Sequence, residues 1–288
     1  MNLSGLFTPD LLITEDTEFS SVGHLLGTGN QRIVPIYRPE DILLAMENEE
    51  VTGIIIPGEF SPLVSRKMGL VLSPDPVLIA LRIQKEISQC TLKSTIQPGR
   101  RGNHTIIHPT ARVAATAVIG DRVVISEYVS IEERTQIGNN VFIGPHTHIG
   151  VIPGTSENHC SEYSSLACGE VIIGDESNIQ SHCTIERPLF SDTTKIGSRC
   201  HIDSQCTIRQ GSRIGNCTLL AAIVTIGEYV QMGEECWAGP RTNLGNGVII
   251  GDECYITLGS SVTKNIKSGM VVRDNYAIRK ERFSGVIP

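Results

Sequence analysis

The sequence predicts a mostly β chain in which a small α/β domain precedes a long stack of three-sided coils. Three observations lead to this fold class. A branched aliphatic residue recurs every six positions between residues 107 and 262, with two interruptions. Aromatic residues make up only 5% of the chain, and 28 of its 288 residues are glycine. A narrow, repetitive core of aliphatic and small side chains accounts for all three.

The six-residue repeat also has a second inward position. Four residues after each aliphatic residue stands a small or β-branched one, as at Val123 and Thr147. Two inward positions two residues apart, followed by a turn, describe a short strand. Three such strands complete a coil of about 18 residues. The aliphatic positions are Ile107, Val113, Ile119, Ile125, Ile131, Ile137, Ile143 and Ile149, then Ile173, Ile179 and Ile185, then Ile196, Ile202, Ile208, Ile214, Leu220, Ile226, Met232, Ala238, Leu244, Ile250, Ile256 and Val262.

Glycine often follows the aliphatic residue directly, as at Gly120, Gly138 and Gly215. Glycine accepts a positive φ without steric cost. We therefore expect these glycines to form the tight corners of the coil.

Several of the nine cysteines fall at the small inward position. No Cys-x-x-Cys pair is present, so we expect buried packing thiols and neither metal ligands nor nucleophiles. Three of them are separated by multiples of 18 residues, which predicts one internal column. The inward cysteines are Cys183, Cys200, Cys206, Cys236 and Cys254, and the column holds Cys200, Cys236 and Cys254.

The first hundred residues lack the repeat. Residues 32–37 are predicted to form a strand, 39–49 a helix and 51–57 a second strand. Residues 73–76 read Ser-Pro-Asp-Pro, which combines a capping side chain with proline near the first turn of a further helix. This order predicts a small α/β domain at 1–98, followed by a linker rich in Gly and Pro.

The predicted organisation is a small, nucleotide-sugar-binding-like domain at 1–98, a coil stack at 104–265 and a C-terminal tail at 266–288. Two insertions interrupt the coils, at 151–171 and 187–195. On a stack of coils, insertions form loops on one face and often build the binding site.

Composition excludes several classes of protein. The net charge is −7 and the pI is about 5.6, which argues against nucleic-acid binding. Hydrophobic residues make up 40%, enough for a folded core, yet no run reaches the length of a membrane span. The nine cysteines and the lack of a recognisable leader indicate a reduced, cytoplasmic location.

The repeat at 104–265 resembles the hexapeptide-repeat acyltransferases, which implies a left-handed parallel β-helix. The domain order resembles, more narrowly, the UDP-3-O-acylglucosamine N-acyltransferase family of lipid A biosynthesis. Val71–Ala80 is similar to the end of that family's uridine-binding domain. Gly169–Gly197, including Thr184–Arg187, and then His201–Cys206 are similar to its middle coils.

Gln210 stands where that family has its catalytic histidine, and Gly247 stands near a second pocket histidine. Glutamine cannot take up a proton at neutral pH. Only Tyr37 is a candidate for the aromatic pair that sandwiches uracil. The resemblance therefore implies a relative that moves an acyl group from acyl-CoA or acyl carrier protein to another nucleotide-linked amino sugar, in surface-polysaccharide or lipopolysaccharide biosynthesis. It also implies a homotrimer with active sites between subunits.

N-acylation needs a neutral amine, a thioester and a stabilised oxyanion, and a base with a pKa near neutrality helps. The candidate bases are His146, His182, His201 and His159, of which one or none acts. His146 and His182 each follow an aliphatic position by three residues, so we expect them to stack on one corner of adjacent coils. Alternatively, the amine arrives unprotonated and the enzyme supplies positioning alone.

The candidate substrate-binding residues are Tyr37, Glu186, Asp192 and Gln210. Glu186 and Asp192 flank the second insertion and could orient a histidine or bind a sugar ammonium group. By resemblance to the last coil of many hexapeptide enzymes, Lys264 is a candidate for the phosphates of coenzyme A. A charge that caps the last coil is the alternative reading of Lys264.

Two other functions stay open. A non-catalytic, nucleotide-sugar-binding or scaffold homologue would explain Gln210. A metal-dependent enzyme of the carbonic-anhydrase type would need three histidine ligands. Glu186-Arg187 stands where the third ligand is expected after His182, so no metal is expected.

Overall fold

A computed structural model describes most of the chain and divides it into two compact units. The first unit contains residues 1–95, 154–168 and 189–192, and the second contains 96–153, 169–188 and 193–288. The first unit thus includes the interiors of both insertions. The described residues are 2–5, 12–27, 29–65, 67–91, 99–153, 163, 166–273 and 276–279.

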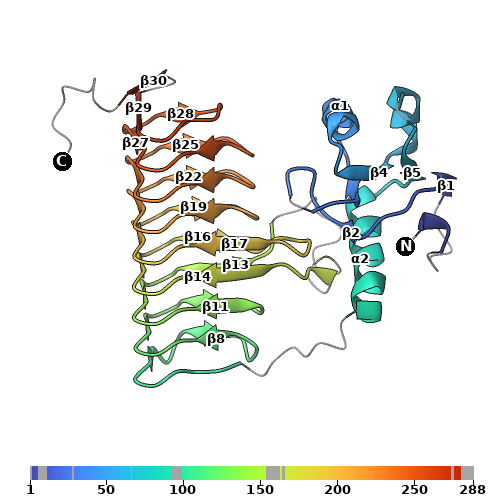
Figure 1. The fold of residues 1–288 in the computed structure, drawn as a ribbon. Coiled ribbons are helices and arrows are strands. Elements are labelled where there is room, and N and C mark those ends of the chain that lie inside the picture. The colour runs from blue at the N-terminus through green and yellow to red at the C-terminus, as the bar shows by residue number, and fades with distance from the viewer. Residues whose placement is uncertain are drawn as a thin grey trace. The chain divides into compact units, whose positions relative to one another are not determined.

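The first unit is built on a five-stranded sheet with the strand order β1-β5-β4-β3-β2 (Figure 1). Strand β1 pairs antiparallel with β5, and the other neighbours are parallel. Its core contains Val34, Ile42, Ile54 and Ile56. The elements are η1 (Leu3–Gly5), β1 (Leu12–Glu15), β2 (Ser21–Val22), β3 (Arg32–Pro35), α1 (Glu40–Glu47), β4 (Val51–Ile56), η2 (Gly58–Leu63), β5 (Gly69–Leu72) and α2 (Pro76–Thr91).

The two predicted strands and two predicted helices of this region are present as β3, β4, α1 and α2. Helix α2 begins as expected, because Leu78 N donates to Asp75 Oδ1 at 3.0 Å and Asp75 N donates to Ser73 Oγ at 3.1 Å. The sequence did not predict β1, β2 or β5. These strands are short, and β1 has a mostly exposed pattern without alternation.

The second unit is a left-handed parallel β-helix with three faces, and the chain passes from face 3 to face 1 to face 2 in each coil (Figure 1). Face 1 contains β7 (Arg112–Val113), β10 (Ser130–Ile131), β13 (His148–Val151), β16 (Thr184–Glu186), β19 (Thr207–Ile208), β22 (Thr225–Ile226), β25 (Asn243–Leu244) and β28 (Ser261–Val262). Face 2 contains β8 (Val118–Ile119), β11 (Thr135–Ile137), β14 (Glu170–Ile173), β17 (Thr193–Ile196), β20 (Arg213–Ile214), β23 (Gln231–Met232) and β26 (Ile249–Ile250). Face 3 contains β6 (Ile106–Ile107), β9 (Val124–Ile125), β12 (Phe142–Ile143), β15 (Asn178–Ile179), β18 (His201–Ile202), β21 (Leu219–Leu220), β24 (Trp237–Ala238), β27 (Tyr255–Ile256), β29 (Met270–Arg273) and β30 (Tyr276–Arg279).

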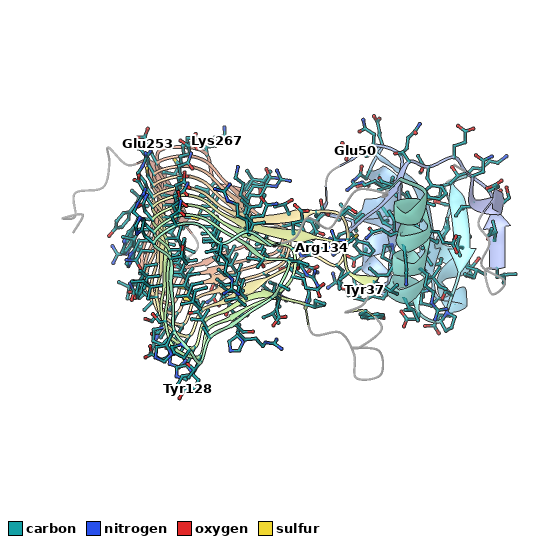
Figure 2. The ribbon with its side chains drawn as sticks, turned by 90° about the horizontal axis from the view of Figure 1, so that it is seen from below. Tyr37, Glu50, Tyr128, Arg134, Glu253 and Lys267 are labelled. Atoms are coloured by element: carbon teal, nitrogen blue, oxygen red, sulfur yellow. The ribbon has the colours of Figure 1, made fainter. Side chains whose placement is uncertain are left out.

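Three corners join these faces. Figure 2, which looks along the stack, shows Tyr128 at one corner, Arg134 at a second and Glu253 at a third. We call the corner between faces 3 and 1 the histidine corner, because it carries His146 and His182. The corner between faces 1 and 2 is the insertion corner, because both insertions leave the coils there.

The predicted aliphatic column is confirmed as the core of the β-helix. Ile131 pairs with Ile149, Ile149 with Ile185 and Ile185 with Ile208 in parallel register. The register therefore resumes after each insertion without changing which side chains point inward. Nearly every one of these aliphatic side chains is buried.

The inward cysteines are buried, as predicted. Cys200, Cys236 and Cys254 precede strands of face 3, and Cys254 N donates to Cys236 Sγ at 3.4 Å, so the internal column exists. Burial raises the pKa of the Cys200 thiol. These thiols fill space in the core, as small hydrophobic side chains do.

The role predicted for the recurring glycines is wrong at all of them except Gly150, which has φ 85°. The residues with positive φ stand two positions later, as at Arg122 (55°) and Asn140 (56°), and the glycines at 120, 138 and 215 have no positive φ. A Cβ at Gly120 would lie 2.4 Å from the carbonyl oxygen of Gly138 in the next coil. The glycines are needed because successive backbones approach closely there, and no side chain fits.

The segments at the edges of the predicted domains also contribute strands. Strand β13 extends to Val151, and β17 begins at Thr193. Beyond residue 265, Ile266 forms a bridge with Ile250, and β29 continues face 3 by pairing with β27. Part of the segment predicted as a C-terminal tail therefore closes the end of the β-helix. None of the helices in the described part of the chain has the length and apolar character needed to cross a membrane.

Candidate active site at the insertion corner

Both insertions leave the β-helix at the same corner. The first connects β13 to β14 and the second connects β16 to β17, and both connections run from face 1 to face 2. In the following coils, short turns at residues 209–211 and 227–229 take their place. The second unit thus brings the ends of both insertions next to the side chains of these turns.

An ionic chain spans three coils at this corner. Arg209 Nε donates to Glu186 Oε2 at 3.3 Å, and Arg209 Nη2 donates to Glu228 Oε1 at 2.7 Å. The Glu186 and Glu228 side chains are each 13% exposed, and that of Arg209 is 36% exposed. One arginine therefore holds two largely buried carboxylates in fixed positions, with charge-assisted hydrogen bonds.

Burial raises the pKa of the Glu186 carboxyl group above its ordinary value, because the charged form is poorly hydrated there. The charge of Arg209 and the hydrogen bond from Gln210 N act in the opposite direction, and the charge of Glu228 adds to the increase. The positive charge of Arg209 therefore compensates the negative charge of the buried Glu186 carboxylate.

Gln210 is buried beside this chain, at 6% exposure. Its backbone N donates to Glu186 Oε2 at 3.1 Å, and its carbonyl oxygen accepts from Tyr229 N at 3.0 Å. Gly211 follows with φ 71°, and its N donates to Thr194 Oγ1 at 2.9 Å. These three hydrogen bonds fix the backbone of the turn. The side-chain amide of Gln210 offers donors and an acceptor but no titratable proton.

Lys264 belongs to the same corner. It lies 54 residues after Gln210, the length of three coils, and follows Val262 by two residues as Gln210 follows Ile208. The Lys264 side chain is exposed. A cation thus stands at the end of the column that begins at Gln210.

The histidine corner carries a stack of rings. The ring centroids of His146 and His182 are 4.9 Å apart with an interplanar angle of 3°, and Tyr128 stacks on His146 at the same distance. The predicted stacking of the two histidines on one corner is confirmed. Face 1 lies between this corner and the insertion corner, so the fold of one chain does not bring these histidines to Gln210.

The remaining histidine candidates lie elsewhere. His201 lies on the outer surface of face 3, where it pairs in register with Asn178 and Leu219. His159 lies outside the described residues. Among the residues that the structure describes, no group of three or more His, Cys, Asp or Glu side chains is arranged to hold a metal ion.

Two of the substrate-binding candidates belong to the first unit. Tyr37 is 55% exposed, and the Arg38 guanidinium lies 5.8 Å from its ring centroid. Asp192 comes close to Gly27, where a Cβ would lie 2.9 Å from Asp192 Oδ2 and 3.3 Å from Arg32 Nη1. Asp192 and Glu186 flank the same insertion, but they are parts of different units.

The interiors of the insertions are attached to helix α2 within the first unit. Tyr163 is buried, and its hydroxyl donates to the Asp75 carboxylate at 2.8 Å. Gln84 Nε2 donates to Cys168 Sγ in the first insertion, and Gln84 Oε1 accepts from Ser191 N at 3.3 Å in the second. One glutamine of α2 therefore ties both insertions to the small domain.

Sequence reasoning did not find Arg209 or Glu228. A signal was present, because Glu186 and Arg209 both occupy the position after the aliphatic residue, where glycine is common. The second insertion lengthens their separation to 23 residues, so a search at the regular coil length does not pair them.

Comparisons with known proteins agree with this architecture. The family model "Bacterial transferase hexapeptide (six repeats)" matches residues 116–150, and a search of curated proteins gives no match. The UDP-N-acetylglucosamine acyltransferase from Campylobacter jejuni superposes with a TM-score of 0.57 at 25% identity, over 65% of this chain and 75% of that one. The Arabidopsis UDP-N-acetylglucosamine acyltransferase superposes with a TM-score of 0.55 at 23% identity, over 62% of each chain, and shows the shared fold. The repeat, the left-handed β-helix and the Campylobacter match together support an acyltransferase of the hexapeptide-repeat type.

Proposed function

We propose that this protein transfers an acyl group from a thioester, acyl-CoA or acyl carrier protein, to the amino group of a nucleotide-linked amino sugar, as a step in lipopolysaccharide or surface-polysaccharide biosynthesis. The observation that carries the proposal is the insertion corner. There Glu186, Arg209 and Glu228 form a largely buried ionic chain around Gln210. The likeness to a UDP-N-acetylglucosamine acyltransferase supports a nucleotide-linked sugar as acceptor.

The chemistry of Gln210 favours nitrogen over oxygen as the acyl acceptor. In the transfer, the acceptor attacks the thioester carbonyl, the C–S bond breaks, and the acceptor's proton leaves with the thiolate or to water. A hydroxyl group needs a base to become a nucleophile, whereas an unprotonated amine already has a free electron pair. Gln210 cannot act as a base, and the Glu186 carboxylate already accepts hydrogen bonds from Arg209 Nε and Gln210 N, so positioning of an amine is the reaction that this corner supports best.

We assign the roles as follows. Glu186, held by Arg209, binds the sugar amino group, and Gln210 orients the sugar or the thioester carbonyl. Lys264, on the same corner, binds phosphate of the acyl donor. Tyr37 and Asp192 bind the nucleotide part of the acceptor. The protein works as a cytoplasmic homotrimer with sites between subunits.

The test is a product analysis with matched acceptors. Purified protein is incubated with acyl-CoA or acyl carrier protein donors and with UDP-, dTDP- and GDP-linked amino sugars, each paired with the sugar that has a hydroxyl in place of the amine. We expect thiol release only with an amino sugar, and a product that keeps its acyl group in mild base, as an amide does. A base-labile ester on the hydroxyl sugar would contradict N-acylation, and background thiol release across the panel would contradict acyl transfer to these sugars.

A further inference from the structure

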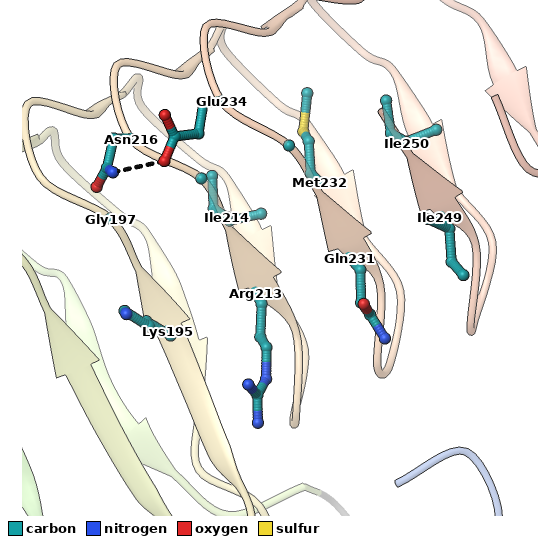
Figure 3. A pocket seen from close by; sticks show the side chains of 12 residues that line it. Lys195, Gly197, Arg213, Ile214, Asn216, Gln231, Met232, Glu234, Ile249 and Ile250 are labelled. Atoms are coloured by element: carbon teal, nitrogen blue, oxygen red, sulfur yellow. Dashed lines mark hydrogen bonds between the residues drawn. The ribbon is translucent and has the colours of Figure 1, made fainter. Parts of the chain in front are cut away.

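The outer surface of face 2 carries a shallow groove of about 360 Å³. Four outward side chains from successive strands line its length, in the order Lys195, Arg213, Gln231 and Ile249. Figure 3 shows these four side chains side by side on one surface of the sheet. The row changes from cationic to polar to apolar along the stack of coils.

Lys195 and Arg213 are direct register partners on β17 and β20. Strands in a sheet are about 4.8 Å apart, and like charges directly opposite each other destabilise the pair. Elsewhere in the described chain, Arg32, Arg112 and Arg209 each pair with a carboxylate. Lys195 and Arg213 form no such pair with any described residue, although the chain has a net charge of −7.

The surroundings leave both cations open to a ligand. On the other side of Lys195 lies Ile172, its register partner on β14. One carboxylate lines the groove, that of Glu234, and it accepts a hydrogen bond from Asn216 Nδ2 at 2.7 Å. Glu170 lies on β14, where it pairs in register with Thr193. An anion bound between the two cations would remove their repulsion.

We propose that Lys195 and Arg213 bind a phosphate or diphosphate group of a substrate. Arginine offers a fork of donors that matches phosphate oxygens, and lysine adds a compact charge. Arg213 follows Gln210 by three residues in the same coil, so this anion site adjoins the insertion corner. The inference deepens the proposed function, on which it rests for the identity of the substrates. Both the nucleotide of the acceptor and coenzyme A carry such groups.

The test is calorimetric titration of the full-length protein with inorganic diphosphate, UDP and coenzyme A. The double variant Lys195→Gln/Arg213→Gln gives both strands the amide side chain that β23 has at Gln231. We expect it to weaken diphosphate binding, and that of UDP or coenzyme A, by about 10-fold to 100-fold, since hydrogen bonds to charged groups are lost. The control Arg122→Gln/Arg199→Gln removes two exposed positive charges at another corner and should change each Kd less than about 2-fold.

The titrations with UDP and with coenzyme A distinguish the two sources of phosphate. Weakened UDP binding alone assigns the site to the nucleotide of the acceptor, and weakened coenzyme A binding alone assigns it to the acyl donor. Unchanged affinity for all three ligands, or no diphosphate binding by the wild-type protein, would overturn the site. If diphosphate binding depends on the two cations while no acyl transfer is detected, the anion site stands and the proposed function fails.

Discussion

The histidine corner and the insertion corner are built from the same coils, yet their side chains behave differently. At the histidine corner, exposed rings of Tyr128, His146 and His182 stack on one another. At the insertion corner, Arg209 bridges two largely buried carboxylates, and the turn that follows is held by hydrogen bonds. A histidine suits catalysis by its chemistry, yet here the two histidines stack on each other. In a β-helix, the contacts that a residue makes with the coils above and below it therefore indicate a site better than its residue type does.

The largest expected difference between the corners is in activity. Arg209→Met keeps the length of the side chain but leaves Glu186 and Glu228 without their partner, so we expect kcat/KM for acyl transfer to fall about 10-fold to 100-fold. The matched variant His146→Asn/His182→Asn should stay within about 3-fold of wild type, because it changes only the ring stack. Steady-state thiol release measures both. The reverse order of effects would move the chemistry to the histidine corner.

The next difference is in stability, and two glycines offer a matched pair. Gly211 at the insertion corner and Gly259 at the histidine corner have φ values of 71° and 70°. A Cβ at Gly259 meets open space, whereas one at Gly211 would lie 2.4 Å from the Tyr229 ring. Gly259→Ala should cost about 1–2 kcal/mol from backbone strain, and Gly211→Ala about 1–3 kcal/mol more from overpacking.

Thermal unfolding followed by calorimetry checks this order. Equal losses for the two alanine variants would show that the Tyr229 ring moves aside freely, and that the insertion corner is no more tightly packed than the other.

The pH dependence separates the corners in a third way. Because burial raises the pKa of Glu186, this group takes up its proton at a higher pH than an ordinary glutamate does as the pH falls. Protonation removes the negative charge that Arg209 and Gln210 N contact, so kcat/KM should decline on the acid side. Protonation of the substrate amine lowers the rate in every variant, so rate profiles should keep the full decline in His146→Asn/His182→Asn and lose only the Glu186 part of it in Glu186→Gln. A decline that disappears only in the histidine variant would assign the titration to the ring stack.

The smallest effect is expected for the stability of the histidine corner. His182 has φ 58°, a conformation that asparagine accepts more easily. His182→Asn also removes a stacking contact of about 0.5–1.5 kcal/mol. These terms oppose each other, so the free energy of unfolding should change by less than about 1 kcal/mol. A chemical denaturation curve with a larger loss would mean that the stack is a structural element in its own right.

Most of the fold could be predicted because the repeat is local. The spacing of the aliphatic residues predicted the buried column, the burial of Cys236 and Cys254, and the stacking of His146 on His182. The glycine prediction failed because the constraint on Gly120 comes from the backbone of the next coil, which a conformational preference does not reveal.

The candidate site was less predictable because its contacts cross the insertions. Glu186 and Arg209 meet after a separation that departs from the regular coil length. Tyr163 and Asp75 are 88 residues apart, and no periodic pattern connects the insertion to helix α2. Only the folded structure shows that the insertion interiors belong to the small domain.

The central claim is that acyl transfer takes place at the insertion corner. A crystal structure of the protein with coenzyme A and a nucleotide-linked amino sugar tests it most directly. We expect the sugar amine to lie against Glu186 and the thiol to lie within reach of the Gln210 turn. A complex in which both groups contact His146 or His182, with Arg209 and Gln210 outside the ligand's reach, would contradict the claim.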